Sequence, residues 1–104
     1  MFNLQQMMKQ AQKMQDQMKD VQSEMENTRF TGTAGGGAVS VTCNGKYEDW
    51  QVCISPEVAS DPSMVEDLMQ AALKDLTSKV NGAMEGKMSS ITAGLNIPGL
   101  KLPF

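Results

Sequence analysis

Apolar side chains recur at alternating steps of three and four residues through the first quarter of the chain. This is the a/d spacing of a helix with one narrow apolar stripe, and seven glutamines lie between the apolar positions. The apolar stripe consists of Leu4, Met7, Ala11, Met14, Met18, Val21 and Met25. The pattern predicts a helix from about Leu4 to Glu26. Such a stripe needs a partner surface, so we expect the chain to work as part of an assembly.

The next part of the chain alternates between apolar and polar residues, as strands do. We expect strands at 29–33, 38–43 and 46–54, with the glycines at 35–37 bending the chain between the first two. Asn44-Gly45 is a strong signal for a two-residue hairpin turn. That turn pairs Cys43 with Lys46 and places Val39 opposite Trp50.

On this register the sheet has one apolar face and one mostly polar face, which is typical of an antiparallel sheet packed on one side. We interpret the apolar face as the core and dimer surface. Its expected members are Phe30, Val39, Val41, Trp50, Val52 and Ile54. Cys43 and Cys53 fall on opposite faces, too far apart for a disulfide, and two free thiols indicate a reducing compartment.

A second helix is predicted over 61–90. Asp61 can cap it with Pro62 at the first helical position, or Ser63 can cap it with Glu66. Apolar residues recur at helical spacing up to Met84. Gly82 and Gly86 leave it open whether the distal half is continued, broken or frayed. Residues 94–104 are expected to form a flexible tail.

The length and composition fit one small domain covering residues 1–104. Only 5% of its 104 residues are aromatic, so its private core is small, and this favours an oligomer. No segment has the run of apolar residues that a membrane span needs, and the chain does not open with the apolar stretch of a secretory signal. We therefore expect a cytoplasmic protein that has no membrane partner.

The sequence offers few residues that could act in catalysis or bind a metal. The chain has no histidine, which removes the commonest general base and the commonest metal ligand. The glycines at 32–37 look superficially like a phosphate loop, but they lack its lysine and its spacing, and a strand follows them. We interpret them as a bend between strands. We predict no catalysis, no metal or other cofactor, and no small-molecule substrate.

Charge is distributed unevenly. Residues 1–19 and 76–104 each carry three lysines and one acid, a net charge of +2, whereas residues 20–75 carry −7. A helix that enters the sheet and a helix that leaves it bring the two basic segments to the same distal end. We hypothesise that this end contacts DNA phosphates. The candidate residues are Lys9, Lys13, Lys19, Lys79 and Lys87.

The order of these features resembles a known family. The chain opens with LQQMMKQAQKMQDQM, continues with FTGTAGGGAVSVTCNGKYE and ISPEV, and closes with GLNIPGLKLPF. Together these segments are similar to the YbaB/EbfC family of bacterial nucleoid-associated proteins. The resemblance implies an α+β fold with a long N-terminal helix, a three-stranded antiparallel sheet and a C-terminal helix. It also implies a sheet-mediated homodimer with projecting helical arms, DNA binding at the nucleoid, and no catalysis.

The small basic segments and the acidic middle predict DNA binding that is weak, of low specificity and sensitive to salt. A second hypothesis is a protein-interaction or scaffold module. Methionine side chains adapt to many shapes, so an exposed methionine stripe can hold a partner's amphipathic helix.

Overall fold

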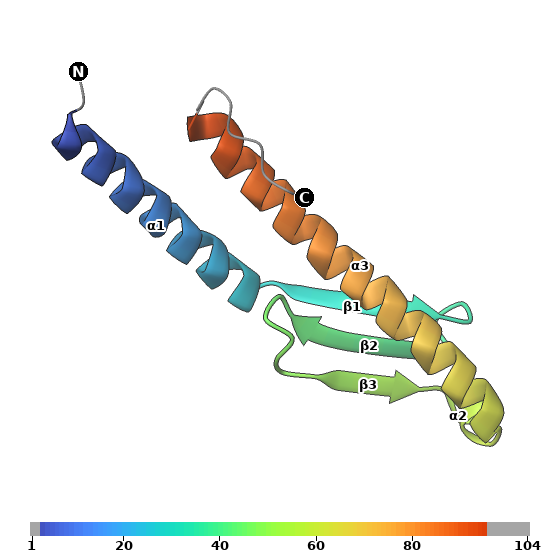
Figure 1. Ribbon diagram of the computed structural model, residues 1–104. Helices are drawn as coiled ribbons and strands as arrows, with labels where there is room; N and C mark the ends of the chain where they lie inside the picture. Colours follow the sequence, from blue (N-terminus) through green and yellow to red (C-terminus); the bar gives the residue numbers. More distant parts are fainter. Residues whose placement is uncertain (1–2, 96–104) are drawn as a thin grey trace.

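The computed structural model describes residues 3–95 (Figure 1). Six elements follow one another along the chain: α1 (Leu4–Glu26), β1 (Arg29–Ala34), β2 (Val39–Asn44), β3 (Gln51–Ile54), α2 (Pro56–Ala59) and α3 (Pro62–Leu95). The strands form one antiparallel sheet in the order β1-β2-β3. This arrangement confirms the predicted α+β fold, to which the structure adds the short helix α2.

Helix α1 begins and ends close to the predicted residues. The Asn3 carboxamide oxygen accepts a hydrogen bond from the backbone N–H of Gln5 and so caps the first turn (3.1 Å). Only the last turns of α1 are packed on the rest of the molecule, where Val21 and Met25 are buried. The first turns project beyond the sheet (Figure 1).

The predicted two-residue turn at Asn44-Gly45 is wrong. Asn44 is the last residue of β2, and the carboxamide oxygen of this buried side chain accepts hydrogen bonds from the backbone N–H groups of Lys46 and Glu48, both at 2.9 Å. These bonds organise a longer loop over residues 45–50, in which Tyr47 and Asp49 take positive φ. The third strand is therefore shorter than predicted, from Gln51 to Ile54.

The longer loop also moves the register by four residues. Val39 pairs with Ile54 and Val41 with Val52, whereas the predicted register paired Val39 with Trp50. Because the shift is an even number, the four residues of β3 keep their predicted faces. Tyr47 does not keep its predicted polar face, because it lies in the loop and its hydroxyl donates a hydrogen bond to Asn81 of α3. Cys43 is buried and Cys53 is exposed, and both thiols are free, as predicted.

Helix α3 runs as one helix from Pro62 to Leu95, through Gly82 and Gly86 and beyond the expected end at residue 90. Asp61 caps it, since its carboxylate accepts a hydrogen bond from the Met64 N–H (3.3 Å). The expected tail at 94–104 begins inside this helix, and its last nine residues, 96–104, lie outside the described residues.

The core lies between α3 and the sheet. Val39, Val41 and Cys43 of β2 are buried against Ala72 and Leu76 of α3. Helix α3 packs chiefly on β1 and β2, then continues past the sheet beside α1 and antiparallel to it (Figure 1). Helix α3 thereby covers one face of the sheet over β1 and β2. Strand β3 forms the edge of the sheet farthest from β1, and its side chains are exposed.

Candidate nucleic-acid interface

The N-terminal end of α1 and the C-terminal end of α3 lie at the same end of the molecule, as predicted (Figure 1). Lys79, which is expected at this end, lies instead over the sheet, where its ammonium contacts Thr31 of β1. On α1, Lys9, Lys13 and Lys19 are all exposed. None of these three side chains forms an ion pair with another residue of the 3–95 segment. Asp16 is the one acid between Leu4 and Lys19. The charges of the three lysines are therefore available to an external anion.

The two candidate lysines of α3 are placed differently. The Lys79 ammonium lies 3.2 Å from the Asp75 carboxylate and donates a hydrogen bond to the Thr31 carbonyl oxygen at 2.8 Å. Lys87 forms an ion pair with Glu24 that links α3 to α1. The structure thus leaves the α1 lysines free and engages the α3 lysines within the chain.

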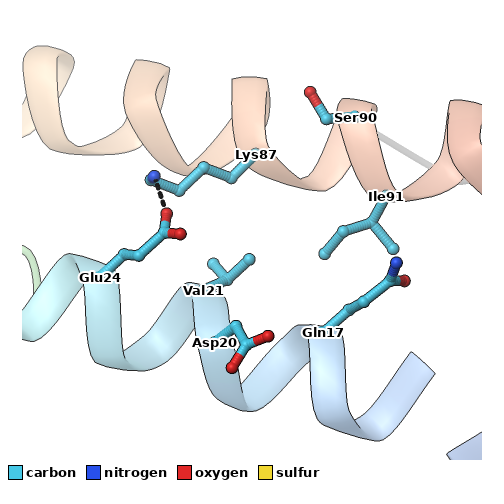
Figure 2. Close-up of a pocket in the computed structure, with 7 residues that line it drawn as sticks. All are labelled: Gln17, Asp20, Val21, Glu24, Lys87, Ser90 and Ile91. Atoms are coloured by element: carbon cyan, nitrogen blue, oxygen red, sulfur yellow. Dashed lines mark hydrogen bonds and ion pairs between the residues drawn. The ribbon is translucent and has the colours of Figure 1, made fainter. Parts of the chain in front are cut away.

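A cleft of about 340 Å³ separates α1 from α3 beside this ion pair (Figure 2). The Lys87–Glu24 pair closes one end, Gln17 lies at the other, and Val21 and Ile91 face each other between them. The buried Oε1 atom of Gln17 has no hydrogen-bond partner within residues 3–95. The full lining is Gln17, Asp20, Val21, Glu24, Lys87, Ser90 and Ile91. The cleft therefore lies between the two helices, at the base of the projecting part of α1.

Among residues 3–95, two groups have shifted pKa values. The pKa of the Asp75 carboxyl is lowered, first by the hydrogen bond from the Thr33 backbone N–H and then by Lys79. Burial raises the pKa of the Cys43 thiol, against a smaller lowering effect of Arg29. A raised pKa keeps that thiol protonated and therefore a poor nucleophile at neutral pH.

The six residues predicted for the core and dimer surface fall into two groups. Val39 and Val41 are buried, and Phe30 packs against the core. Trp50, Val52 and Ile54 are exposed in the single chain, to 48%, 52% and 38%. Trp50 stacks on Tyr47, with the two ring centres 6.3 Å apart, and extends this apolar surface.

Sequence reasoning missed the contacts of Asp75 and Tyr47. Asp75 accepts a hydrogen bond from a strand residue 42 positions away, and the Tyr47 hydroxyl donates to the Asn81 carboxamide oxygen, 34 positions away (3.1 Å). No local pattern marks such pairs, because both depend on how α3 crosses the sheet.

Within residues 3–95, no cluster of three potential metal ligands is found, and no helix has the length and apolarity to cross a membrane.

The fold and these surfaces define a small helix–sheet–helix protein with a projecting, basic helical end. The chain belongs to the YbaB/EbfC DNA-binding family, whose model matches residues 1–95. This confirms the resemblance found in the sequence.

Curated relatives agree with this assignment, and a solved structure shares the fold. A nucleoid-associated protein of Xanthomonas axonopodis pv. citri is 47% identical over 103 residues, covering 98% of this chain and 97% of that protein. One from Clostridium acetobutylicum is also 47% identical, over 94% of this chain and 89% of its own. The crystal structure of an uncharacterized protein from Helicobacter pylori has the same fold, with a TM-score of 0.79 at 21% identity, covering 88% of this chain and 98% of that one.

Proposed function

We propose that this chain is a non-enzymatic nucleoid-associated protein that binds duplex DNA weakly and with low specificity, as a homodimer in the cytoplasm. Its membership of a DNA-binding family supports a DNA partner. The observation that carries the proposal is the exposure of Lys9, Lys13 and Lys19, unpaired within residues 3–95, on the projecting part of α1.

The placement of these lysines around the helix suits an electrostatic contact. At about 100° per residue, the three lie within roughly 120° of each other on the side of α1 opposite the apolar stripe. They span about 15 Å along the axis, over which duplex DNA carries roughly nine phosphate charges. Three charges per chain against so many phosphates give weak binding that salt readily displaces.

Lys79 and Lys87 contribute less under this proposal. Each is already neutralised by a carboxylate of the same chain, so a phosphate must compete with Asp75 or Glu24 for it. The glutamines of α1 can donate hydrogen bonds to phosphate oxygens or base edges, but phosphate contacts carry no sequence information. The acidic middle of the chain repels DNA and confines contact to the helical end.

The homodimer is supported by the exposed side chains of β3 and its loop. Trp50, Val52 and Ile54 continue the apolar face that α3 covers over β1 and β2. A second copy that covers this surface removes apolar area from water on both chains at once, which stabilises the pair. A dimer also doubles the number of lysines that one particle offers to DNA.

A second function is favoured by one observation, the exposure of the apolar stripe. Leu4 is 71% exposed, Met7 52% and Met14 37%. This surface fits the amphipathic helix of a partner protein, and methionine adapts to such partners. In this alternative, the projecting part of α1 (the arm) binds a partner protein, and the lysines form a polar rim around that contact.

Charge reversal on the arm distinguishes the two functions. We expect Lys9→Glu/Lys13→Glu to weaken binding to a labelled DNA duplex by roughly tenfold or more in fluorescence anisotropy at low salt. The matched control Lys46→Glu/Lys74→Glu makes the same change in net charge elsewhere and is expected to bind much closer to wild type. Equal losses in both variants would rule out a contact localised to the arm.

The apolar stripe provides the complementary variant. Met7→Gln/Met14→Gln changes exposed side chains and leaves every lysine in place. DNA binding is expected to be unchanged. A loss of DNA binding in this variant, with Lys9, Lys13 and Lys19 intact, would contradict a DNA contact that is made by the lysines alone.

A further inference from the structure

The two edges of the sheet are treated differently by the rest of the molecule. Because the strand order is β1-β2-β3, both β1 and β3 have a strand on one side only. An unpaired strand edge presents backbone N–H and C=O groups that can bind a strand of another chain. Each edge of this sheet is therefore a potential site of assembly.

The edge of β1 is occupied by side chains of α3. The Asp75 carboxylate accepts a hydrogen bond from the Thr33 N–H at 3.0 Å, and the Lys79 ammonium donates to the Thr31 carbonyl oxygen at 2.8 Å. Thr31 and Thr33 are two residues apart, so these groups point to the same side of β1, away from β2. The two side chains also pair with each other at 3.2 Å.

Close packing of α3 on β1 makes these bonds possible. A Cβ on Gly32 would lie 2.1 Å from the Ala72 carbonyl oxygen and 2.6 Å from the Leu76 nitrogen. Only glycine permits this approach. Since the helix backbone lies directly on the strand, the short side chain of Asp75 reaches round to the strand edge. The lowered pKa of Asp75 is consistent with a carboxylate held by these donors.

The edge of β3 has a different surface. Val52 and Ile54 are exposed, because α3 covers this face of the sheet over β1 and β2 and does not extend over β3 (Figure 1). This strand carries no lysine or proline, the residues that natural edges use against unwanted pairing.

We propose that Asp75 and Lys79 seal the edge of β1 against strand addition, so that a second copy of this chain can join the sheet only at β3. The consequence is a closed assembly. A contact from β3 of one copy to β1 of the next would be head-to-tail and could repeat without end, whereas β3 against β3 is satisfied by two copies. This inference rests on the proposed homodimer for its β3 half, and on the hydrogen bonds and ion pair within one chain for its β1 half.

The test opens the sealed edge. Asp75→Ala/Lys79→Ala removes both bonds, and Asp67→Ala/Lys74→Ala is the matched control, with the same charge change on exposed positions of the same helix. Light scattering on a sizing column measures the mass at rising protein concentration. We expect species larger than wild type from the first variant, increasing with concentration, and the wild-type mass from the control.

Hydrogen exchange of the Thr33 amide gives an independent readout on the same samples. Loss of its acceptor is expected to speed exchange roughly tenfold. Faster exchange with an unchanged mass would overturn the proposal, because the bonds would then exist without restricting assembly. Unchanged exchange and unchanged mass would overturn it as well.

Two further variants keep the test decisive. If the double variant fails to fold by circular dichroism, Lys79→Met frees the Thr31 carbonyl alone and is judged by the same mass criterion. Val52→Lys places a charge on the β3 surface and is expected to convert a wild-type dimer to a monomer. A wild type that is already monomeric would refute the homodimer, whereas association induced by opening β1 would still support the seal.

Discussion

The two ends of α1 share one sequence pattern but have different surroundings. The last turns place Val21 and Met25 in the core, and the Met25 carbonyl oxygen accepts a hydrogen bond from the Gly45 N–H at 2.7 Å. The first turns carry Leu4 and Met7 at the same heptad positions, and both are largely exposed.

This difference shows that the two ends of α1 have different roles. The C-terminal end is anchored by α3 and by the loop after β2, and its side chains serve stability. The N-terminal end contributes little buried area to the single chain. Its geometry is that of a projecting arm, with lysines on one side and the apolar stripe on the other.

The largest effect is expected from truncating the anchored end. Met25 is fully buried, so Met25→Ala should lower the free energy of unfolding by about 2–5 kcal/mol, because the substitution removes packed atoms and leaves a cavity. Met7→Ala, at the exposed end, should change it by less than about 0.5 kcal/mol. Urea unfolding followed by circular dichroism measures both. Similar losses would show that the N-terminal stripe is buried in the protein in solution.

A smaller effect is expected where the loop meets α1. A Cβ on Gly45 would lie 2.7 Å from the Met25 carbonyl oxygen, so Gly45→Ala should cost about 1–3 kcal/mol by forcing the loop from the helix end. Gly82→Ala is the control, because nothing lies within 4 Å of its added Cβ. Alanine should stabilise that helix by about 0.5–1 kcal/mol. A stabilised Gly45 variant in the same unfolding assay would refute this anchoring contact.

The smallest effect concerns pH and Asp75. Its pKa is lower in the folded chain than in the unfolded one, so its contribution is fully present above the ordinary carboxyl pKa and is lost as pH falls through the lowered value. We expect wild type to lose more stability than Asp75→Asn over that acidic range. Parallel thermal melts from neutral to acidic pH measure the difference, and superimposable pH profiles would contradict it.

Much of the fold could be predicted because its signals are local. The stripe gives α1 almost to the residue, Asp61-Pro62 gives the start of α3, and the glycines at 35–37, all at positive φ, give the bend between β1 and β2. The β2–β3 loop could not be predicted from Asn44-Gly45. There, the Asn44 side chain accepts hydrogen bonds from the loop backbone. The Gly45 N–H donates to the Met25 carbonyl oxygen, a contact that depends on the tertiary packing of α1.

The sequence identified the lysines of the candidate interface, but it did not show all of the ion pairs that already engage them within the chain. The sequence places five lysines on the two helices, and the structure shows that Lys79 and Lys87 are engaged by Asp75 and Glu24. Asp75 is one helical turn from Lys79 and is visible as a pair, whereas Glu24 is 63 positions from Lys87. Only the antiparallel packing of α1 beside α3 brings that second pair together.

The central claim, that the free lysines of α1 bind DNA phosphates, is tested most directly by the salt dependence of binding. The slope of log affinity against log salt should be steep for wild type. It should fall by about 0.9 for each phosphate that Lys9→Gln/Lys13→Gln/Lys19→Gln no longer neutralises. Anisotropy titrations of one duplex at several salt concentrations give both slopes. A variant slope equal to that of wild type would contradict the account.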